Sequence, residues 1–298
     1  MAELAEGTKD AEFEDFRSLL FSVAYRMLGS ATDAEDAVQE SWLRWNAATD
    51  VREPRAWLIR AITNICLDEL RSARARREQY VGPWLPEPVL TSDGFDDPLA
   101  AVQRRDLISL GALRILERLS PRERAALVLR EGLGLSHSEV ATALGGTEGA
   151  SRQLLARARR RLPADLRAAG GRLPDPADHR RLVEAMLAAF ESGDLAPLLS
   201  LLGEDVQLHS DGGGQARAAL RPITGVEKVL RFLAGLRQRE GGRVEISVVE
   251  VNGLPGLLVT EAGRPVVVTS QRLSGGRAVE LLLVVAPDKL ARVRRQLA

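Results

Sequence analysis

The chain has 298 residues, of which 45% are hydrophobic, which is enough for about two domains with buried cores and excludes a wholly disordered protein. No apolar run exceeds the six residues of 281–286, far short of the roughly 18 that span a membrane. The acidic N-terminal residues contain no apolar stretch typical of a secretory signal, and the single cysteine, Cys66, cannot form an internal disulfide. We therefore expect a soluble cytoplasmic protein with no membrane partner.

Charge is balanced overall, with 41 basic and 41 acidic residues, but it is unevenly distributed along the chain. Residues 1–50 carry 4 basic and 11 acidic side chains, and residues 83–103 carry no basic and 4 acidic ones. Residues 51–82 carry 7 basic and 4 acidic side chains, and residues 104–172 carry 14 and 7. Two basic modules between acidic ones suit a protein that contacts a polyanion at two places and a basic partner, or itself, elsewhere.

Clusters of proline and glycine divide the chain into three modules joined by two linkers. The clusters fall within residues 83–98 and 163–176, where a helix cannot continue uninterrupted. The first two modules follow a 3.6-residue apolar period, and the pattern becomes mixed after residue 204. The expected segments are 1–79, 80–103 (linker), 104–163, 164–177 (linker) and 178–298.

The first module contains a helix with an acidic face. A capping-box pattern, Thr32 followed by Glu35, predicts that this helix begins there and continues to Trp45. Its apolar side chains share one broad face and are expected in the core. The opposite face collects polar side chains around an isolated leucine: Asp33, Asp36, Gln39, Glu40 and Leu43. This face is either a docking surface for a basic partner or a solvated charged face, and the helix alone favours the second.

The next helix begins near Pro54 and has a narrow polar stripe. The stripe consists of four residues, Arg60, Asn64, Asp68 and Arg71. Asparagine can hydrogen-bond base edges while arginines neutralise phosphates, so the stripe is typical of nucleic-acid recognition. The alternative is a solvated helix end, where the helix dipole favours arginines.

The second module contains two short helices joined by a glycine turn. Ser136 and Glu139 form a capping box for the first helix, and Gly145 and Gly146 end it. Thr147 is the expected N-cap of the second helix. The buried stripe of that helix is expected at Ala150, Leu154, Ala158 and Leu162.

Arginines on the outward face of this second helix favour a DNA-binding helix-turn-helix over a simple helical hairpin. The side chains near its start are expected to meet base edges, and the later arginines are expected to contact phosphates. The candidate DNA contacts are Thr147, Ser151, Arg152, Gln153, Arg157, Arg159 and Arg160.

The third module has the pattern of an α+β domain. Residues 178–190 and 225–236 follow a helical period, and residues 243–248 alternate as a strand does. Asn252 and Gly253 predict a hairpin turn.

His209 and Asp211 are the polar candidates for general base catalysis in this module. The glycines that follow Asp211 fit a tight turn more simply, so we expect no catalytic residue. The three histidines of the chain lie far apart in the sequence, and no metal site or cofactor is expected.

The order of these features resembles the extracytoplasmic-function (ECF) group of sigma factors. The resemblance is carried by FRSLLFSVAYRMLGSATDAEDAVQESWLRW, PRAWLIRAITNICLDELRS and LSPRERAALVLREGLGLSHSEVATALGGTEGASRQLLARARRRL. These runs look like sigma regions 2 and 4, and the match covers about residues 13–78 and 104–162. It implies a helical bundle for region 2 and a helix-turn-helix for region 4.

The resemblance also implies roles for the two polar surfaces of the first module. The acidic face, with Asp33, Asp36, Gln39, Glu40 and Leu43, becomes the contact surface for the RNA polymerase core enzyme. The stripe of Arg60, Asn64, Asp68 and Arg71 becomes the surface that opens the promoter and holds the melted strand. Asn46, in the loop before that helix, is the expected contact of a flipped base.

The remainder resembles a subgroup of these sigma factors with a SnoaL-like domain fused at the C-terminal end. YVGPWLPEPV resembles the linker of that subgroup, and DGGGQ and APDKL each differ by one residue from two of its motifs. Gln215 stands where relatives carry a basic residue, which puts any salt bridge there in doubt. The resemblance implies a curved mixed sheet against helices, a cone whose hollow often holds a small apolar molecule. The implied regulatory or pocket residues are Trp84, Leu85, Pro86, Glu87, Pro88, His209, Asp211, Gly212, Gly213, Gly214, Asp288 and Lys289.

Three functions fit parts of this sequence. They are a sigma factor controlled by its fused domain, a one-component DNA-binding regulator that senses a small molecule, and a cyclase or isomerase with an attached DNA-binding module. A one-component regulator has no use for the acidic helix, and an enzyme needs a reactive pocket of which the sequence shows little. We therefore expect a monomeric, non-enzymatic sigma factor. Its expected partners are RNA polymerase core enzyme and double-stranded and melted promoter DNA, with a small-molecule ligand left open.

Overall fold

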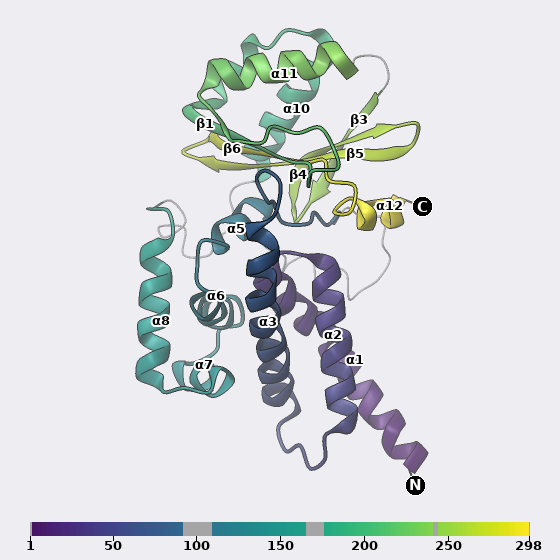
Figure 1. Cartoon of the computed structure of the whole chain (residues 1–298), viewed down its shortest axis with the longest axis vertical. Helices are drawn as coiled ribbons and strands as arrows, with labels where there is room; N and C mark the ends of the chain where they lie inside the picture. Colours follow the sequence, from purple (N-terminus) through teal and green to yellow (C-terminus); the bar gives the residue numbers. More distant parts are fainter. Residues whose placement is uncertain (1, 92–108, 165–175, 241–243, 298) are drawn as a thin grey trace. The chain divides into compact units, whose positions relative to one another are not determined.

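The structure is a computed structural model that describes residues 2–91, 109–164, 176–240 and 244–297. The expected linker residues 92–103 and 165–175 lie outside these ranges. Contacts within the chain divide it into two compact units, whose elements are labelled in Figure 1. Among the described residues, the first unit comprises 2–78 and 115–164, and the second comprises 79–91, 109–114, 176–240 and 244–297.

Three long helices open the first unit: α1 (Ala2–Leu28), α2 (Ala31–Ala47) and α3 (Pro54–Glu78). Their apolar faces meet in a core that includes Val23, Val38 and Ile62. The hydroxyl of Ser30 accepts a hydrogen bond from the Asp33 amide at 3.1 Å and caps α2. The prediction that Thr32 caps this helix is therefore wrong, because α2 begins one residue before Thr32, whose side chain is exposed.

A helix-turn-helix completes the first unit. Its segments are α6 (Pro121–Leu127), the π-helix η1 (Val128–Gly132), α7 (His137–Leu144) and α8 (Glu148–Arg161). The predicted capping box of Ser136 and Glu139 is confirmed, and Gly145 ends α7 in the left-handed region with a φ of 61°. Thr147 caps α8 as predicted, because its hydroxyl accepts a hydrogen bond from the Ala150 amide at 3.2 Å.

The buried stripe of α8 differs from the prediction. Ser151, Leu155 and Ala158 are buried, whereas Ala150 is exposed and Leu154 is only half-buried. A strict interval of four drifts around a helix of 3.6 residues per turn, so residues spaced by four and then three stay on one face. The buried face therefore includes Ser151 and Leu155, each one residue after a predicted position, and it keeps Ala158 as predicted.

The second unit is built on a six-stranded mixed sheet in the order β2-β1-β6-β5-β4-β3. Only β1 and β6 pair in parallel among these strands, and the hairpin from β3 to β4 turns at Asn252 and Gly253 as predicted, with φ of 52° and 77°. The strands are β1 (Leu202–Asp211), β2 (Ile223–Thr224), β3 (Val244–Val251), β4 (Leu254–Glu261), β5 (Arg264–Ser274) and β6 (Arg277–Val284).

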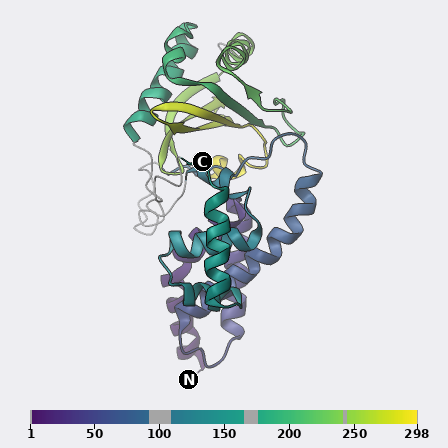
Figure 2. The same cartoon turned by 90° about the vertical axis from the view of Figure 1, so that its left-hand side faces the viewer.

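The helices of this unit are α10 (Pro176–Ser192), the 3₁₀ segment η2 (Ala196–Ser200), α11 (Val226–Glu240) and α12 (Ala291–Leu297). Figures 1 and 2 show α10 and α11 on one side of the sheet and α12 on the other. The helix α5 (Leu110–Leu116) begins in the second unit and ends in the first. The expected fold class, two helical modules and a C-terminal α+β module with a mixed sheet, is confirmed.

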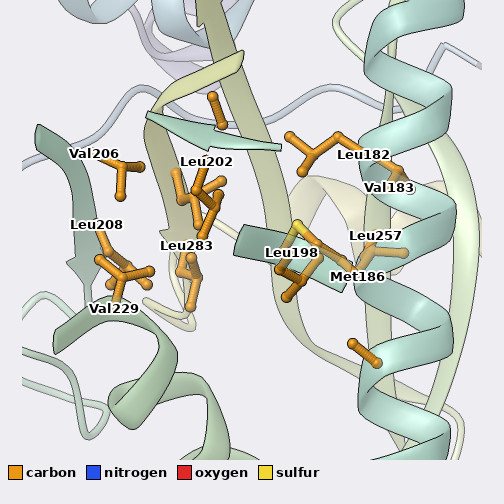
Figure 3. Close-up of a cluster of buried hydrophobic side chains, with 13 residues drawn as sticks. Leu182, Val183, Met186, Leu198, Leu202, Val206, Leu208, Val229, Leu257 and Leu283 are labelled. Atoms are coloured by element: carbon orange, nitrogen blue, oxygen red, sulfur yellow. The ribbon is translucent and has the colours of Figure 1, made fainter. Parts of the chain in front are cut away.

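The core of the second unit lies between the sheet and the pair α10 and α11 (Figure 3). Met186 of α10 packs there with Leu208 of β1 and Leu281 of β6. Because side chains alternate along a strand, the neighbours of these leucines point to the other face, here called the outer face. His209 and Asp211 of β1 lie on this outer face, away from the apolar core.

Candidate functional site

Residues 80–91, here called the linker segment, are bound to the C-terminal part of the second unit. The segment has no regular secondary structure except a bridge between Leu90 and Val251. Leu85 through Thr91 are all buried. Pro86 and Pro88 have no backbone N–H, so neither of these two residues adds a buried donor that would need a partner.

Asp211 is the centre of the first contact region of the linker segment. Its carboxylate is fully buried and accepts hydrogen bonds from the Tyr80 hydroxyl at 2.6 Å and the Leu85 amide at 2.7 Å. It also accepts bonds from the Gly213 amide at 3.1 Å and the Lys289 ammonium at 2.6 Å. Four donors satisfy a buried carboxylate well, so this contact is strong and specific in geometry.

Lys289 holds the same part of the linker segment from the other side. Its ammonium donates to the Leu85 carbonyl oxygen at 2.5 Å, so Leu85 is bonded through both backbone groups. The ammonium lies 3.9 Å from the ring centre of Trp84 and 4.9 Å from that of Tyr80, within the range of cation–π attraction. Burial, followed by the hydrogen bond to Asp211, raises the pKa of the Tyr80 phenol well above its ordinary value. We call Tyr80, Trp84, Leu85, Asp211 and Lys289 the Asp211 clasp.

The three glycines after Asp211 let the chain turn tightly beside the linker segment. A Cβ at Gly212 would lie 2.4 Å from the Ala216 carbonyl oxygen, which is closer than any real contact. Gly213 and Gly214 have φ of 59° and 73°, in the left-handed region that glycine tolerates best. The tight turn predicted from the triple glycine is confirmed. The backbone amide of Gln215 completes the turn by donating to the Gly212 carbonyl at 3.0 Å.

The far end of the linker segment is bonded by the side chains of Asn252 and Gln296. The side-chain oxygen of Asn252 accepts a hydrogen bond from the Val89 N–H at 3.2 Å. The backbone N–H of Asn252 donates to the Val89 carbonyl oxygen at 2.9 Å. The side-chain amide of Gln296 accepts from the Leu90 N–H at 3.1 Å and donates to its carbonyl at 3.0 Å. The sequence predicts Asn252 only as a turn residue. No local pattern around Gln296 predicts that it binds the linker segment.

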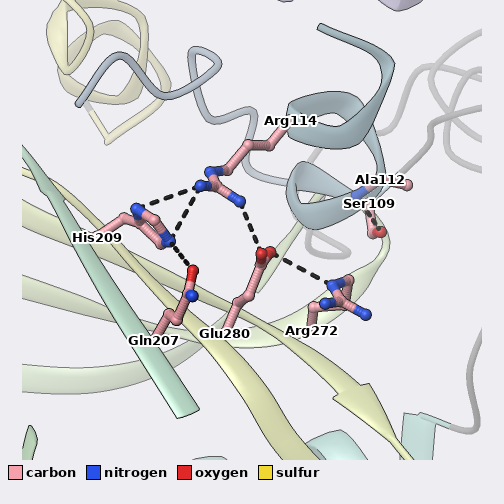
Figure 4. Close-up of polar contacts among 7 residues, drawn as sticks. All are labelled: Ser109, Ala112, Arg114, Gln207, His209, Arg272 and Glu280. Atoms are coloured by element: carbon pink, nitrogen blue, oxygen red, sulfur yellow. Dashed lines mark hydrogen bonds and ion pairs between the residues drawn. The ribbon is translucent and has the colours of Figure 1, made fainter. Parts of the chain in front are cut away.

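His209 and Asp211 do not form a joint site. The imidazole of His209 contacts Arg114 and Gln207, whereas the carboxylate of Asp211 is used by the clasp (Figure 4). Asp288 lies beside the clasp, where its carboxylate accepts a hydrogen bond from the Lys289 backbone amide at 2.9 Å. Glu87 is buried within the linker segment.

In the first unit, the polar face predicted on α2 is formed and open. Asp36 and Gln39 are exposed, and Asp33 and Glu40 are partly exposed. Glu40 pairs with Arg44 at 2.9 Å. Leu43 is 51% exposed, so an apolar side chain stands among these polar groups. The surface has the composition of a docking site for a basic partner.

The polar stripe predicted on α3 is also exposed. Arg60, Asn64, Asp68 and Arg71 all face solvent along one line of the helix. Asp68 pairs with Arg71 at 2.7 Å, which holds that guanidinium against the helix. Asn46 is exposed, but it lies in the last turn of α2 and not in the loop before α3, so the predicted start of that loop is wrong.

On α8, most of the predicted DNA contacts are exposed. Thr147 caps the helix, and the exposed candidates are Arg152, Gln153, Arg157, Arg159 and Arg160. Arg152 pairs with Glu148 at 2.7 Å, and Arg159 pairs with Glu131 at 2.5 Å.

Ser151 is the exception among these candidates. The side chain of Ser151 is buried, and its hydroxyl lies 3.1 Å from His137 Nδ1 of α7. Ser151 is therefore turned into the helix pair and does not lie on the exposed face with the other candidates.

Over the described ranges, no group of three or more His, Cys, Asp or Glu side chains is placed to hold a metal ion. No helix in the described part of the chain is long and apolar enough to cross a membrane.

Two protein-family models match the chain. Sigma-70 region 2 matches residues 13–76, and Sigma-70, region 4, matches residues 110–162. The first match covers most of the helical bundle of α1 to α3, and the second includes the helix-turn-helix of α7 and α8. The class of protein is thus a sigma-70-type sigma factor with regions 2 and 4.

Comparison with whole proteins narrows this class. The ECF RNA polymerase sigma factor SigJ of Mycobacterium tuberculosis is 42% identical over 94% of this chain and 92% of its own length. A probable ECF RNA polymerase sigma factor of the same organism, SigI, is 32% identical over 96% of both chains. The crystal structure of M. tuberculosis SigJ superposes with a TM-score of 0.77 and 38% identity, covering 95% of this chain and 98% of that one. The chain belongs to the ECF RNA polymerase sigma factors.

Proposed function

We propose that the activity of this ECF sigma factor is controlled by its own C-terminal SnoaL-like domain, acting on the linker segment. The observation that carries the proposal is the Asp211 clasp, which bonds the chain between regions 2 and 4 to that domain through buried groups. A sigma factor must place region 2 and region 4 on separate promoter elements, so a domain that holds the connecting chain can control their separation.

We assign the polymerase contact to an exposed face of α2 and the two DNA contacts to exposed faces of α3 and α8. The exposed face of α2 binds the RNA polymerase core enzyme through Asp33, Asp36, Gln39, Glu40 and Leu43. The exposed stripe of α3 and Asn46 hold the melted strand, and Arg152 and Gln153 of α8 read base edges in the major groove. Arg157, Arg159 and Arg160 contact phosphates. We infer a cytoplasmic location, since the protein acts with RNA polymerase.

Run-off transcription with purified core polymerase tests this function. The proteins compared are the full chain, a chain ending at Gly171, and the full-length variants Lys289→Met and Arg152→Ala. Arg152→Ala should reduce template dependence by about 5- to 150-fold, because a bidentate base contact contributes about 1 to 3 kcal/mol. Lys289→Met opens the clasp and should alter the yield of promoter-dependent transcript.

The matched control is Lys228→Met, which removes an exposed lysine of α11 in the same unit. It should transcribe as the parent does. Transcription that is unchanged both by Lys289→Met and by the shortened chain would show that the C-terminal domain does not control the sigma factor.

A further inference from the structure

The guanidinium of Arg114 is bound on the outer face of the sheet (Figure 4). Its Nη1 lies 2.7 Å from Glu280 Oε1 of β6, and the two side chains are only 15% and 5% exposed. Its Nη2 lies 3.0 Å from Nε2 and 3.2 Å from Nδ1 of His209, whose residue is 2% exposed. A buried carboxylate and a buried imidazole thus contact the two terminal nitrogens of one arginine.

The distances to His209 define how the two groups meet. Both ring nitrogens lie within hydrogen-bond distance of Arg114 Nη2, so the guanidinium can donate to whichever of them carries no proton. Gln207 Oε1 lies 3.3 Å from Nε2, a distance from which it can accept a hydrogen bond from the ring.

Glu280 is shared between two arginines. Its other oxygen, Oε2, lies 3.3 Å from Nε of Arg272 on the neighbouring strand β5. A Cβ at Gly111 would lie 3.1 Å from the Cβ of Arg272, so the first turn of α5 approaches β5 closely. That turn is itself capped by Ser109, whose hydroxyl accepts from the Ala112 amide at 3.3 Å.

We propose that Gln207, His209 and Glu280 form a guanidinium-binding site through which the C-terminal domain holds the start of region 4 by Arg114. The match to region 4 begins at residue 110, and residues 109–114 belong to the second unit together with the linker segment. Both stretches that lead into the first unit, at residues 79 and 114, are then fixed on one domain. We call this second contact the Arg114 anchor.

The inference rests on the proposed function and deepens it. The Asp211 clasp holds the segment that follows α3, and the Arg114 anchor holds the first residues of α5, so the domain holds both ends of the chain that joins regions 2 and 4. Control then needs both contacts, and release of Arg114 alone should change transcription.

Distance measurement by electron–electron spin resonance tests the anchor in the full chain. Spin labels are attached at Arg118→Cys and Glu261→Cys, two exposed positions after α5 and at the end of β4. Cys66 is fully buried and is replaced by alanine to keep labelling specific. Arg114→Met should broaden the distance distribution relative to that of the parent, because it releases the start of α5 from the domain.

The control Arg277→Met removes an exposed arginine at the start of β6, the strand that carries Glu280. Its distance distribution should match that of the parent. Glu280→Gln should broaden it, and the double variant with Arg114→Met should add little, because both changes break one contact. Thermal unfolding of each variant identifies loss of fold, which would appear as a lost transition rather than a broader distance. An unchanged distribution in Arg114→Met, or additive effects in the double variant, would overturn the anchor.

Run-off transcription separates this inference from the proposed function. If Lys289→Met alters transcription while Arg114→Met alters neither the distances nor the transcript, the anchor fails and control by the clasp stands. If neither variant alters transcription, the proposed function fails as well. If Arg114→Met broadens the distances and changes the transcript yield, both are supported.

Discussion

The ammonium of Lys289 lies 2.6 Å from the carboxylate of Asp211 and 3.9 Å from the ring centre of Trp84. The lysine precedes α12 and the aspartate ends β1, so two segments 78 residues apart meet at the linker segment. Removing two charges from water is costly, and the cost is offset only when each has close partners. Here the carboxylate accepts four hydrogen bonds, one of them from the Lys289 ammonium. Removing either charge therefore leaves the other buried without its counter-charge.

Lys289→Met should lower the free energy of unfolding of the second unit by about 3 kcal/mol, because it leaves the Asp211 carboxylate buried without its counter-charge. Urea unfolding followed by tryptophan fluorescence measures this loss, since Trp84 lies within the clasp. The double variant Lys289→Met with Asp211→Asn should recover at least about 1 kcal/mol of it. An equal or larger loss in the double variant would mean that the two charges are not coupled.

The raised pKa of Tyr80 predicts how stability depends on alkaline pH. The folded phenol keeps its proton above the ordinary tyrosine pKa of about 10, whereas the unfolded chain releases it. The stabilising contribution is therefore complete below about pH 10 and is lost as the pH rises further. Urea midpoints at pH 8 and pH 11 should differ more for the parent than for Tyr80→Phe, in which this phenol is absent.

At pH 8, Tyr80→Phe should also unfold about 1 kcal/mol more easily, because Asp211 loses one hydrogen bond. The second tyrosine, Tyr25, is present in both proteins and contributes equally to both pH series. Parallel pH dependences in the two proteins would contradict the assignment of the raised pKa to Tyr80.

Local sequence patterns predicted the elements and turns of this fold well. Ser136, Thr147 and Asn252 lie at the caps and the turn that their side chains favour, because such contacts join residues a few positions apart. The exception is α2, which is capped by Ser30 and not by the predicted Thr32.

The contacts of the linker segment could not be predicted in the same way. Gln296 and Leu90 are 206 positions apart, and Arg114 and His209 are 95 apart, so only the assembled sheet brings them together. His209 and Asp211 were expected in one site, and they do share a face of β1. They stand two residues apart on that strand, about 7 Å, which is enough to give them separate partners.

The buried position of Ser151 predicts a contrast between two residues of α8. Arg160→Ala should lower the slope of log affinity against log salt by about one, measured by anisotropy on duplex DNA between 50 and 200 mM salt, because it removes one phosphate contact. Ser151→Ala should leave that slope unchanged. It should instead lower stability by about 1 kcal/mol, because the hydrogen bond to His137 is lost. A reduced slope in Ser151→Ala would show that its hydroxyl reaches the DNA.

The exposed leucine of α2 gives the sharpest test of the polymerase surface. Leu43→Asp should weaken binding to core polymerase at least about tenfold, or roughly 1.4 kcal/mol, because it places a charge at the apolar centre of the contact. The melting temperature should hardly change, since Leu43 is 51% exposed in the free protein. Leu199→Asp is the matched control, because Leu199 is 54% exposed but belongs to the second unit. Competition for core polymerase against a labelled parent chain measures both affinities, and equal binding by the two variants would place the polymerase contact elsewhere than on α2.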